Sequence, residues 1–340
     1  MRVLVALSGG VDSSVAAALL LDAGHEVVGV TLKLWGGAQD SGCCSVGDVE
    51  DARRVAQQLG IVHHVFNFTD DFARYVVEPY VADHAAGRTP NPCIECNRHL
   101  KFDRLVVRAA QLGFDAVATG HHARVIVDKA GPHLLRGADR AKDQSYVLYT
   151  LGRQQLARLV FPVGELTKVE VREQAAALHL RTASKPESQD TCFVTAGGRA
   201  AFLGDRIPLR PGRILDASGA TIGSVPAIEL VTVGQRRGLG GAVGERRYAL
   251  AVDGPAATVT VGSEADLSTD RVPMGPPAWV GDAPVAGQPV TIQCSAHGRP
   301  ADGWWDGEAA CFARPERRPA PGQAVVLYDG DEVLGGATAA

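Results

Sequence analysis

The sequence predicts an α/β fold, with a parallel sheet covered by helices in the first part of the chain and β-rich modules in the rest. Three observations predict it. Apolar runs bounded by glycines alternate with helical patterns in the first third of the chain, as βαβ units require. Short strand patterns with glycine-rich turns take over from about Phe202. The 39 glycines and 19 prolines are typical of a chain with many turns.

Four segments in the first third have the length and apolar content of buried parallel strands. They are Val3–Leu7, Glu26–Trp35, His63–Phe68 and Phe114–Gly120. Helical patterns lie between them, over Ser13–Gly24 with Gly24 as the expected C-cap, along a stripe from Val49 to Leu59, and over Leu105–Leu112. This order predicts a sheet with helices on both faces.

The pattern changes after the fourth strand. Residues Ala123–Gly137 predict a β-hairpin, and Thr167 and Glu170 have the spacing of a capping box before a helix. A proline-rich stretch from Pro273 to Pro284 separates two β-rich regions. We therefore expect a catalytic domain over residues 1–200, a small β-rich central domain over 201–272, and a C-terminal β-barrel over 273–340 that binds the partner molecule.

Composition narrows the class of protein. Apolar residues make up 46% and charged residues 21% of the chain, as in ordinary globular proteins. No apolar run reaches the ~20 residues that span a bilayer, and the first ten residues are too short an apolar stretch for a secretory signal. We therefore expect a cytoplasmic protein with no membrane partner. The seven cysteines are an odd number, which in the cytoplasm indicates chemistry or metal binding more often than structural disulfides.

Charge points only locally to a nucleic acid. The net charge is −4, which does not favour such a partner. Between residues 88 and 108, however, the sequence has five basic residues and only two acidic ones. The basic residues are Arg88, Arg98, Lys101, Arg104 and Arg108, and the acidic ones are Glu95 and Asp103. A solvated helix face explains this cluster equally well.

The strongest local signal is "SGGVDSSV", Ser8 to Val15, between the first strand and the first helix. Glycines allow successive backbone N–H groups to turn inward as an anion nest, and the helix directs its positive dipole end at the same point. Asp12 is placed to orient Mg²⁺ or a substrate group. Because no Gly-Lys-Ser/Thr follows, the loop is not a Walker motif.

Two more segments end at the same edge of the predicted sheet. The backbone at Leu32, near the end of the second strand, is expected beside the adenine of a nucleotide, and Gly120 ends the fourth strand there. His121 follows directly as a possible phosphate or substrate contact, although a histidine in that place is more often a packed, hydrogen-bonded residue.

The loop resembles the pyrophosphate loop of the N-type ATP pyrophosphatases (the PP-loop superfamily), which leave AMP on a substrate oxygen. Five further stretches follow in order: "GRTPNPCIECNRHLKF" (Gly87–Phe102), "KDQSYVLY" (Lys142–Tyr149), "ESQDTCF" (Glu187–Phe193), "TVGQRRGL" (Thr232–Leu239) and "PGQAVVLYDGDEVLGG" (Pro321–Gly336). Together they resemble the bacterial tRNA-specific 2-thiouridylases, from about residue 2 to 336.

The resemblance implies a tRNA sulfurtransferase that uses ATP and Mg²⁺ to convert the wobble uridine (U34) of tRNA Lys, Glu and Gln to 2-thiouridine. It implies that the C2 oxygen is adenylated and then replaced by sulfur from a cysteine desulfurase or a sulfur-relay protein. The implied ATP-binding residues are Ala6, Leu7, Ser8, Gly9, Gly10, Val11, Asp12, Ser13, Leu32 and Gly120. The implied contacts to the target base or the tRNA are Asn91, Pro92, Cys93, His121, Lys142, Asp143, Gln144 and Gln323.

The resemblance also gives two cysteines roles. It implies that Cys96 is the nucleophile and that Cys192 carries a persulfide, with a Cys96–Cys192 disulfide left after sulfur transfer. Cys93 departs from the family pattern, because many relatives have aspartate there. A second route is therefore open, in which Cys93, Cys96 and Cys192 bind a [4Fe–4S] cluster that delivers sulfide. We favour the persulfide route.

Three other interpretations of these motifs remain, two of which involve zinc. Zinc on the C-x-x-C pair needs two more ligands, which His99 or His121 would have to supply. An amide-forming or argininosuccinate-type ligase would share the loop but would not need the distant cysteine. A zinc-knuckle RNA-binding protein with a vestigial loop is disfavoured by the intact "SGGVDSSV". The adjacent Cys43 and Cys44 have no role that we can assign.

Overall fold

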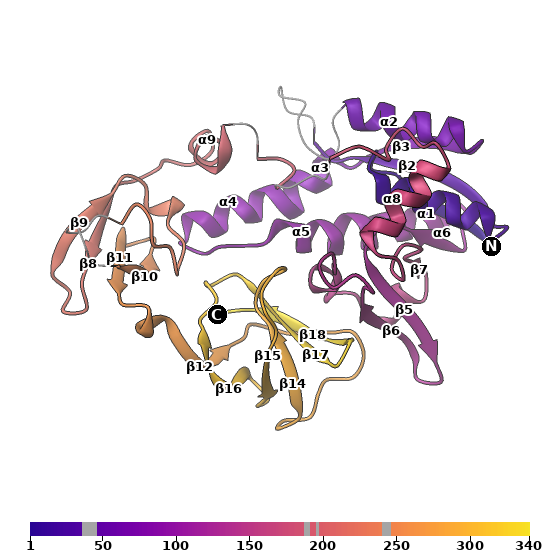
Figure 1. The fold of residues 1–340 in the computed structure, drawn as a ribbon. Helices are drawn as coiled ribbons and strands as arrows, with labels where there is room; N and C mark the ends of the chain where they lie inside the picture. The colour runs from indigo at the N-terminus through magenta and orange to yellow at the C-terminus, as the bar shows by residue number, and fades with distance from the viewer. Residues whose placement is uncertain (36–45, 187–190, 195–196, 240–245) are drawn as a thin grey trace.

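A computed structural model of the chain describes residues 1–35, 46–186, 191–194, 197–239 and 246–340. Five parallel strands form the first sheet (Figure 1), in the order β3-β2-β1-β4-β7. Their bounds are β1 Arg2–Ala6, β2 Glu26–Lys33, β3 Val62–Asn67, β4 Ala116–Ala118 and β7 Leu159–Val160. The four predicted strands are therefore confirmed, and β7 is an addition, a strand too short to give a sequence pattern.

Alternation along the strands explains why helices cover both faces of this sheet. Val3 and Val5 pack with helices α1 (Val11–Asp22) and α2 (Val46–Gln58). Leu4 points to the opposite face and belongs to a larger core. That core includes residues of three helical runs: α3 Thr69–Phe72 with the π-helix η1 Ala73–Val77 and α4 Glu78–Ala85; α5 Pro92–Glu95 with the π-helix η2 Cys96–Arg104 and α6 Leu105–Gln111; and α9 Gly198–Gly204.

The remaining helices are short and lie between or after the strands. The predicted capping box is present, because Thr167 accepts from the Glu170 amide and Glu170 accepts from the Thr167 amide at the start of α8. The bounds of these elements are η3 Ser145–Leu148, α7 Arg153–Leu156, α8 Lys168–Ala177, η4 Ile228–Leu230 and η5 Ala265–Leu267. No helix among the described residues is long and apolar enough to cross a membrane.

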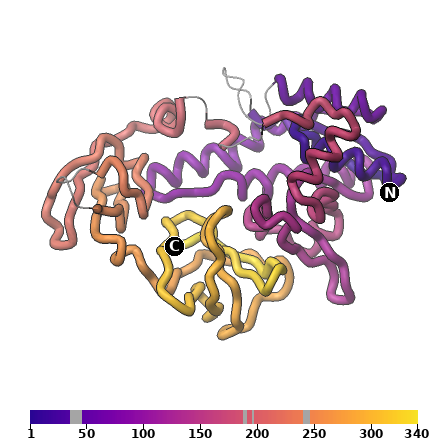
Figure 2. The backbone as a smooth tube through the Cα atoms, in the orientation of Figure 1, coloured from indigo at the N-terminus to yellow at the C-terminus, as the bar shows by residue number. Residues whose placement is uncertain are grey.

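The central module is a four-stranded sheet with its own core, in the order β10-β11-β8-β9. Its strands are β8 Gly212–Leu215, β9 Thr221–Val225, β10 Tyr248–Asp253 and β11 Thr258–Gly262. In Figure 2 it lies at the far end of the long helical run that leaves the first domain. Gly87, just after α4, and Gly254 pack closely against the facing backbone, since an added Cβ would lie 3.2 Å from the Val252 carbonyl and 2.8 Å from the Ala85 carbonyl respectively.

The third sheet has nine strands and joins the C-terminal module to the first domain. Its strands are β5 Ala123–Asp128, β6 Gly131–Arg136, β12 Ser268–Pro273, β13 Ala278–Trp279, β14 Pro289–Gln293, β15 Ala301–Trp305, β16 Ala309–Arg317, β17 Ala324–Asp329 and β18 Glu332–Thr338. The predicted hairpin is present as β5 and β6, but it pairs with β18 of the C-terminal module. Strand β12 also pairs in this sheet, with β16, so the module begins before residue 273 and the proline-rich stretch lies inside it.

Candidate active site

The "SGGVDSSV" segment forms a tight turn between β1 and α1. Gly9 has a φ of +74°, which glycine adopts without the strain of a Cβ. The carbonyl of Gly10 accepts hydrogen bonds from the hydroxyls of Ser13 (3.2 Å) and Ser14 (2.8 Å). The Ser13 hydroxyl oxygen also accepts from the Ser8 amide at 3.2 Å. The two serines thus fix the loop ahead of the first helical turn, where an anion would bind.

Asp12 is the charged centre of this loop. The ammonium of Lys168 lies 2.7 Å from each of its carboxylate oxygens, and Nε2 of His122 lies 3.2 Å from Oδ1. Burial raises the pKa of Asp12, but hydrogen bonds from His122 and Lys168 and the charge of Lys168 outweigh it, so the pKa lies below its ordinary value. Asp12 is therefore an ionised carboxylate neutralised by a lysine from the start of α8.

Gly120 makes the close approach expected at the end of the fourth strand. A Cβ there would lie 2.5 Å from the Ser13 amide nitrogen and 2.9 Å from Cβ of Asp12, so only glycine fits without moving the loop. The next residue, His121, is hydrogen-bonded within its own segment. It is buried, its Nδ1 lies 2.7 Å from Oγ1 of Thr119, and burial holds its pKa well below the ordinary value.

His122 is the histidine that contacts the loop, although no motif in the sequence distinguishes it from His121. Its amide donates to Oε1 of Gln144 at 2.9 Å, and the amide of Gln144 donates to the His122 carbonyl at 2.9 Å. This pairing aligns the "KDQ" stretch with the edge of the phosphate loop. Gln144 is exposed there.

The second strand is hydrogen-bonded to Leu7, the residue just before the loop. The amide of Leu7 donates to the Val30 carbonyl at 2.8 Å, and the hydroxyl of Thr31 donates to the Leu7 carbonyl at 2.8 Å. Leu32, the next residue, is buried near the carboxyl end of β2. The expected adenine-side backbone and the phosphate loop therefore share one edge of the sheet.

The "TPNPC" segment begins a helix with its own cap. Asn91 is the N-cap of α5, and its side-chain oxygen accepts from the Cys93 amide at 3.1 Å. Pro92 occupies the first helical position, which suits its fixed φ. Cys93 is exposed, whereas Cys96 is 8% exposed where α5 passes into the π-helix η2. The two thiols of the C-x-x-C pair thus have different surroundings.

Cys192 lies beside the same apolar core as Cys96. It is half-buried and packs against that core, of which Cys96 is a member. The neighbouring Phe193 anchors it, because its ring contacts those of Tyr80 and Phe202 with centroids 5.2 Å and 5.1 Å apart. Residues 96 positions apart in the sequence are in this way brought to one core.

Cys93, Cys96 and Cys192 are not arranged as a metal-binding set in the part of the chain that the structure describes. Within the described part of the chain, which includes all three of Cys93, Cys96 and Cys192, no three His, Cys, Asp or Glu side chains are grouped to hold a metal. His99, considered as a zinc ligand, lies between Glu95 (3.2 Å) and Asp103 (3.5 Å) and stacks on a tyrosine instead. Cys43 and Cys44 lie outside the described residues.

The structure gives Asp143 a position unlike that of a nucleic-acid contact. Its carboxylate and the guanidinium of Arg136 form a buried pair at 2.9 Å, with side chains 6% and 9% exposed. Its two oxygens also accept from the amides of Gly137 and Ser145 and from the Ser145 hydroxyl. Arg136 donates onward to Gln293 at 2.8 Å. Asp143 thus links the first domain to the C-terminal module.

The other expected tRNA contacts lie at or near the surface. Lys142 is half-buried beside Gln144. Gln323 accepts from the Ala320 amide through its side-chain oxygen at 2.9 Å, which shapes the turn at Gly322. That turn packs against the segment before "PNPC", since the Thr89 amide donates to the Pro321 carbonyl at 2.8 Å.

Part of the basic cluster is neutralised locally. Arg88 pairs with Asp83 at 2.5 Å and Arg104 with Asp71 at 2.9 Å. Arg98 is exposed on η2. The positive charge predicted from the sequence is therefore smaller than the count of basic residues suggests, because acidic partners come from α3 and α4.

Family models match most of the chain. The description "tRNA methyl transferase HUP domain" matches residues 1–196, "tRNA methyl transferase PRC-barrel domain" residues 200–263, and "Aminomethyltransferase beta-barrel domain" residues 276–339. A tRNA-specific 2-thiouridylase of Roseiflexus sp. (strain RS-1) is 47% identical, over 98% of both chains, and one of Mycobacterium avium (strain 104) is 45% identical, over 100% of this chain and 99% of that protein. The chain belongs to the tRNA-specific 2-thiouridylase family.

Membership of the 2-thiouridylase family confirms the resemblance and the fold class expected from the sequence. The three matched ranges fall on the parallel-sheet domain, the central module and the C-terminal module in turn. Among solved structures, a 4-thiouridine synthetase–RNA complex with bound ATP is similar at 20% identity and a TM-score of 0.38, over 56% of this chain and 44% of that one. The NMN synthetase of Francisella tularensis is similar at 18% identity and a TM-score of 0.35, over 55% of this chain and 66% of that one.

Proposed function

We propose that this chain uses ATP to convert the wobble uridine (U34) of tRNA Lys, Glu and Gln to 2-thiouridine. One observation carries the proposal: full-length similarity to tRNA-specific 2-thiouridylases in a chain that holds both a phosphate loop and two cysteines on one core. ATP binds at Ser8–Ser13, with Leu32 and Gly120 beside it. The anticodon loop presents the target base unpaired, which lowers the cost of extruding it.

The first step activates the base. A uridine C2 oxygen is a poor leaving group and must be activated before sulfur can replace it. The oxygen attacks the α-phosphorus of ATP, pyrophosphate leaves, and AMP remains on that oxygen as the better leaving group. Backbone N–H groups of the loop and the N-terminal end of α1 bind the negative charge of the phosphates in ATP and keep these contacts while AMP forms. Mg²⁺ would neutralise phosphate charge here, and one carboxylate, Asp12, suits an ion held mainly by phosphates. Lys168 would then release a carboxylate oxygen to it.

The second step transfers sulfur. The terminal sulfur of a persulfide on Cys192 attacks C2 and AMP leaves, which gives a base–S–S–Cys192 intermediate. The thiolate of Cys96 attacks the Cys192 sulfur, the base keeps its sulfur as C=S, and a Cys96–Cys192 disulfide forms. Two electrons from a thiol reductant restore both thiols. A cysteine desulfurase or a sulfur-relay protein supplies the persulfide sulfur.

Binding of the substrate uses the surface around these groups. Asn91, Pro92 and the exposed Cys93 precede Cys96 by three to five residues and would contact the base. Lys142, Gln144 and Gln323 would contact tRNA. Asp143 contributes through the position of the "KDQ" stretch. His121, which is buried after the fourth strand, would contribute through its packing on Phe102 and Phe161.

The cluster route fits this arrangement less well. Three cysteines that ligate one cluster must converge, and Cys93, Cys96 and Cys192 are not grouped so among the described residues. Their exposures also differ, from exposed Cys93 to buried Cys96. We therefore derive no step through a cluster and propose the persulfide pair.

The test is 2-thiouridine formation on tRNA with ATP and a persulfide donor, followed by nucleoside analysis. Cys96→Ala and Cys192→Ala should each abolish the product while ATP binding remains. Cys294→Ala is the matched control, because burial raises the pKa of this thiol to about 12, and it should retain activity. Product formed by Cys96→Ala would refute its role, and pyrophosphate exchange that needs no tRNA would favour a small-molecule ligase.

A further inference from the structure

A second lysine, outside the steps described above, is bonded to the phosphate loop. The ammonium of Lys185 donates to the Gly9 carbonyl at 3.0 Å and lies 2.6 Å from Asp48 and 2.7 Å from Asp51. Both aspartates are on α2, so one side chain joins the loop to a neighbouring helix. The hydrogen bonds and charges of Asp48 and Asp51 outweigh burial and raise the pKa of Lys185, so it stays protonated.

The loop and α2 are in direct contact at this point. A Cβ on Gly9 would lie 2.4 Å from the Asp48 carbonyl oxygen. The first turn of α2 therefore contacts the loop at Gly9, whose backbone is left-handed, and the space there admits no side chain. Lys185 stabilises this contact, because its ammonium bonds the Gly9 carbonyl and the carboxylates of Asp48 and Asp51 at the same time.

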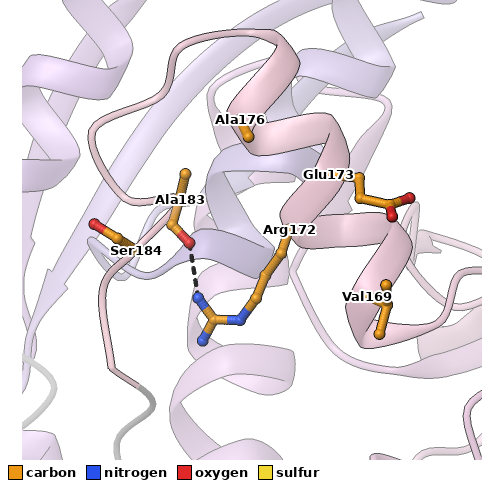
Figure 3. Close-up of a pocket in the computed structure, with 6 residues that line it drawn as sticks. All are labelled: Val169, Arg172, Glu173, Ala176, Ala183 and Ser184. Carbon is orange, nitrogen blue, oxygen red and sulfur yellow. Dashed lines mark hydrogen bonds between the residues drawn. The ribbon is translucent and has the colours of Figure 1, made fainter.

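The backbone that carries Lys185 is itself held from α8. Arg172 donates to the Ala183 carbonyl at 2.7 Å and to the Lys185 carbonyl at 3.2 Å. Figure 3 shows the guanidinium reaching from α8 across a surface pocket to the Ala183 carbonyl, with Ser184 beside it. Two bonds to consecutive parts of one segment restrict its movement, so the Lys185 side chain starts from a fixed point.

Peptide geometry explains what this arrangement does. The peptide between Gly9 and Gly10 is trans, so its C=O and N–H point in opposite directions. Fixing the Gly9 carbonyl on Lys185 therefore fixes the direction of the Gly10 N–H. The Gly10 carbonyl is fixed in the same way by Ser13 and Ser14, which sets the Val11 N–H. Two consecutive amides are thus oriented by bonds made on the other side of their peptides.

We propose that Lys185 is a positioning residue for ATP, which orients the phosphate-binding amides of the loop by holding the Gly9 carbonyl against α2. The inference rests on the proposed function, since it takes the loop to be the ATP site. It acts through backbone direction, so Lys185 affects how tightly the phosphates bind. The rate of the chemical step at saturating ATP does not depend on it.

The experiment compares full-length variants in three measurements: calorimetric binding of a non-hydrolysable ATP analogue without tRNA, KM for ATP and kcat for 2-thiouridine formation, and thermal unfolding. Lys185→Met should weaken analogue binding and raise KM by about tenfold or more, with kcat and tRNA affinity near wild type. Lys185→Arg, which keeps a donor for the carbonyl, should recover most of the affinity. Arg181→Met is the matched control, since Arg181 pairs with Asp51 at 3.6 Å from an exposed position, and it should bind normally.

A second variant separates positioning from direct contact. Asp51→Asn weakens the hold on Lys185 and should weaken analogue binding in the same direction as Lys185→Met. Stronger binding by Asp51→Asn would make Lys185 a phosphate ligand and overturn the proposal, as would unchanged binding by a folded Lys185→Met or equal losses in Lys185→Met and Arg181→Met. Analogue binding is measured without tRNA, so a wild type that binds it but forms no 2-thiouridine would refute the function and leave this inference standing.

Discussion

Asp143→Ala distinguishes the role that the structure gives this residue from the one expected from the sequence. The sequence resemblance predicts a tRNA contact, whereas the structure buries the carboxylate at the junction with the C-terminal module. There it accepts from Arg136 at 2.9 Å and from two backbone amides at 3.0 Å. Removal of the carboxylate leaves a guanidinium 9% exposed without its counter-ion.

The magnitude follows from that burial. Removing one partner of a buried ion pair costs about 3–5 kcal/mol, because the other charge stays buried and uncompensated. Arg136 keeps its bond to Gln293 at 2.8 Å and its position 3.5 Å from the ring centroid of Tyr328. These contacts offset part of the loss, so we expect a decrease of about 3 kcal/mol in the free energy of unfolding.

Urea unfolding followed by tryptophan fluorescence measures this, since Trp279 and Trp305 pack edge-to-face in the C-terminal module at 5.4 Å. The control is Arg140→Met, whose pair with Asp331 lies at the same junction but is 54% and 39% exposed. It should change stability by no more than about 1 kcal/mol. Asp143→Ala with control-like stability but lost tRNA affinity would refute the buried-network reasoning and support a direct contact.

Three further predictions follow from single sites. Gly120→Ala should weaken ATP-analogue binding about tenfold or more in calorimetry, because overpacking against the loop costs ~1–3 kcal/mol; unchanged affinity would contradict the close approach. Glu332 raises the pKa of His133 above its ordinary 6.5. The stabilisation of the folded state by the His133–Glu332 pair is therefore complete below pH 6.5 and is lost as pH rises through the raised pKa. Denaturation of wild type and His133→Gln should therefore differ at about pH 6 and converge by about pH 9; an equal difference at both would count against the pair. Protein purified without oxygen should hold well under one iron per chain; about four irons and four sulfides, lost in Cys93→Ala, would restore the cluster route.

The local parts of the fold were predictable from the sequence because their signals are local. Four parallel strands, the hairpin Ala123–Gly137 and the capping box at Thr167 depend on periodicity, turn residues and short spacings. Strand pairing between modules has no such signal. The hairpin shows no feature that indicates β18 as its neighbour, and the proline-rich stretch after Pro273 has the composition of a linker although β13 lies within it.

The site divides in the same way. The phosphate loop and the cysteine pair are contiguous motifs that a sequence displays directly, and the structure packs Gly120 against Ser13 and Asp12 of the loop. For the pair "HH" the sequence left two roles open for His121, a phosphate or substrate contact or a packed residue, because which of two neighbours faces the loop depends on the path of the chain after the strand. His122 contacts Asp12, and His121 is buried against the rings of Phe102 and Phe161.

The lysines show where the limit lies. A half-buried carboxylate in an anion-binding loop must be paired with a cation, so Asp12 alone predicts a positive partner nearby. The chain has 34 lysines and arginines, and nothing local favours one of them. Lys168, which pairs with Asp12, lies 156 residues from it in the sequence. Lys185, which bonds the Gly9 carbonyl, lies 176 residues from Gly9. Elementary electrostatics therefore requires the cation, while the packing of α8 and the segment after it decides which residues supply the charge.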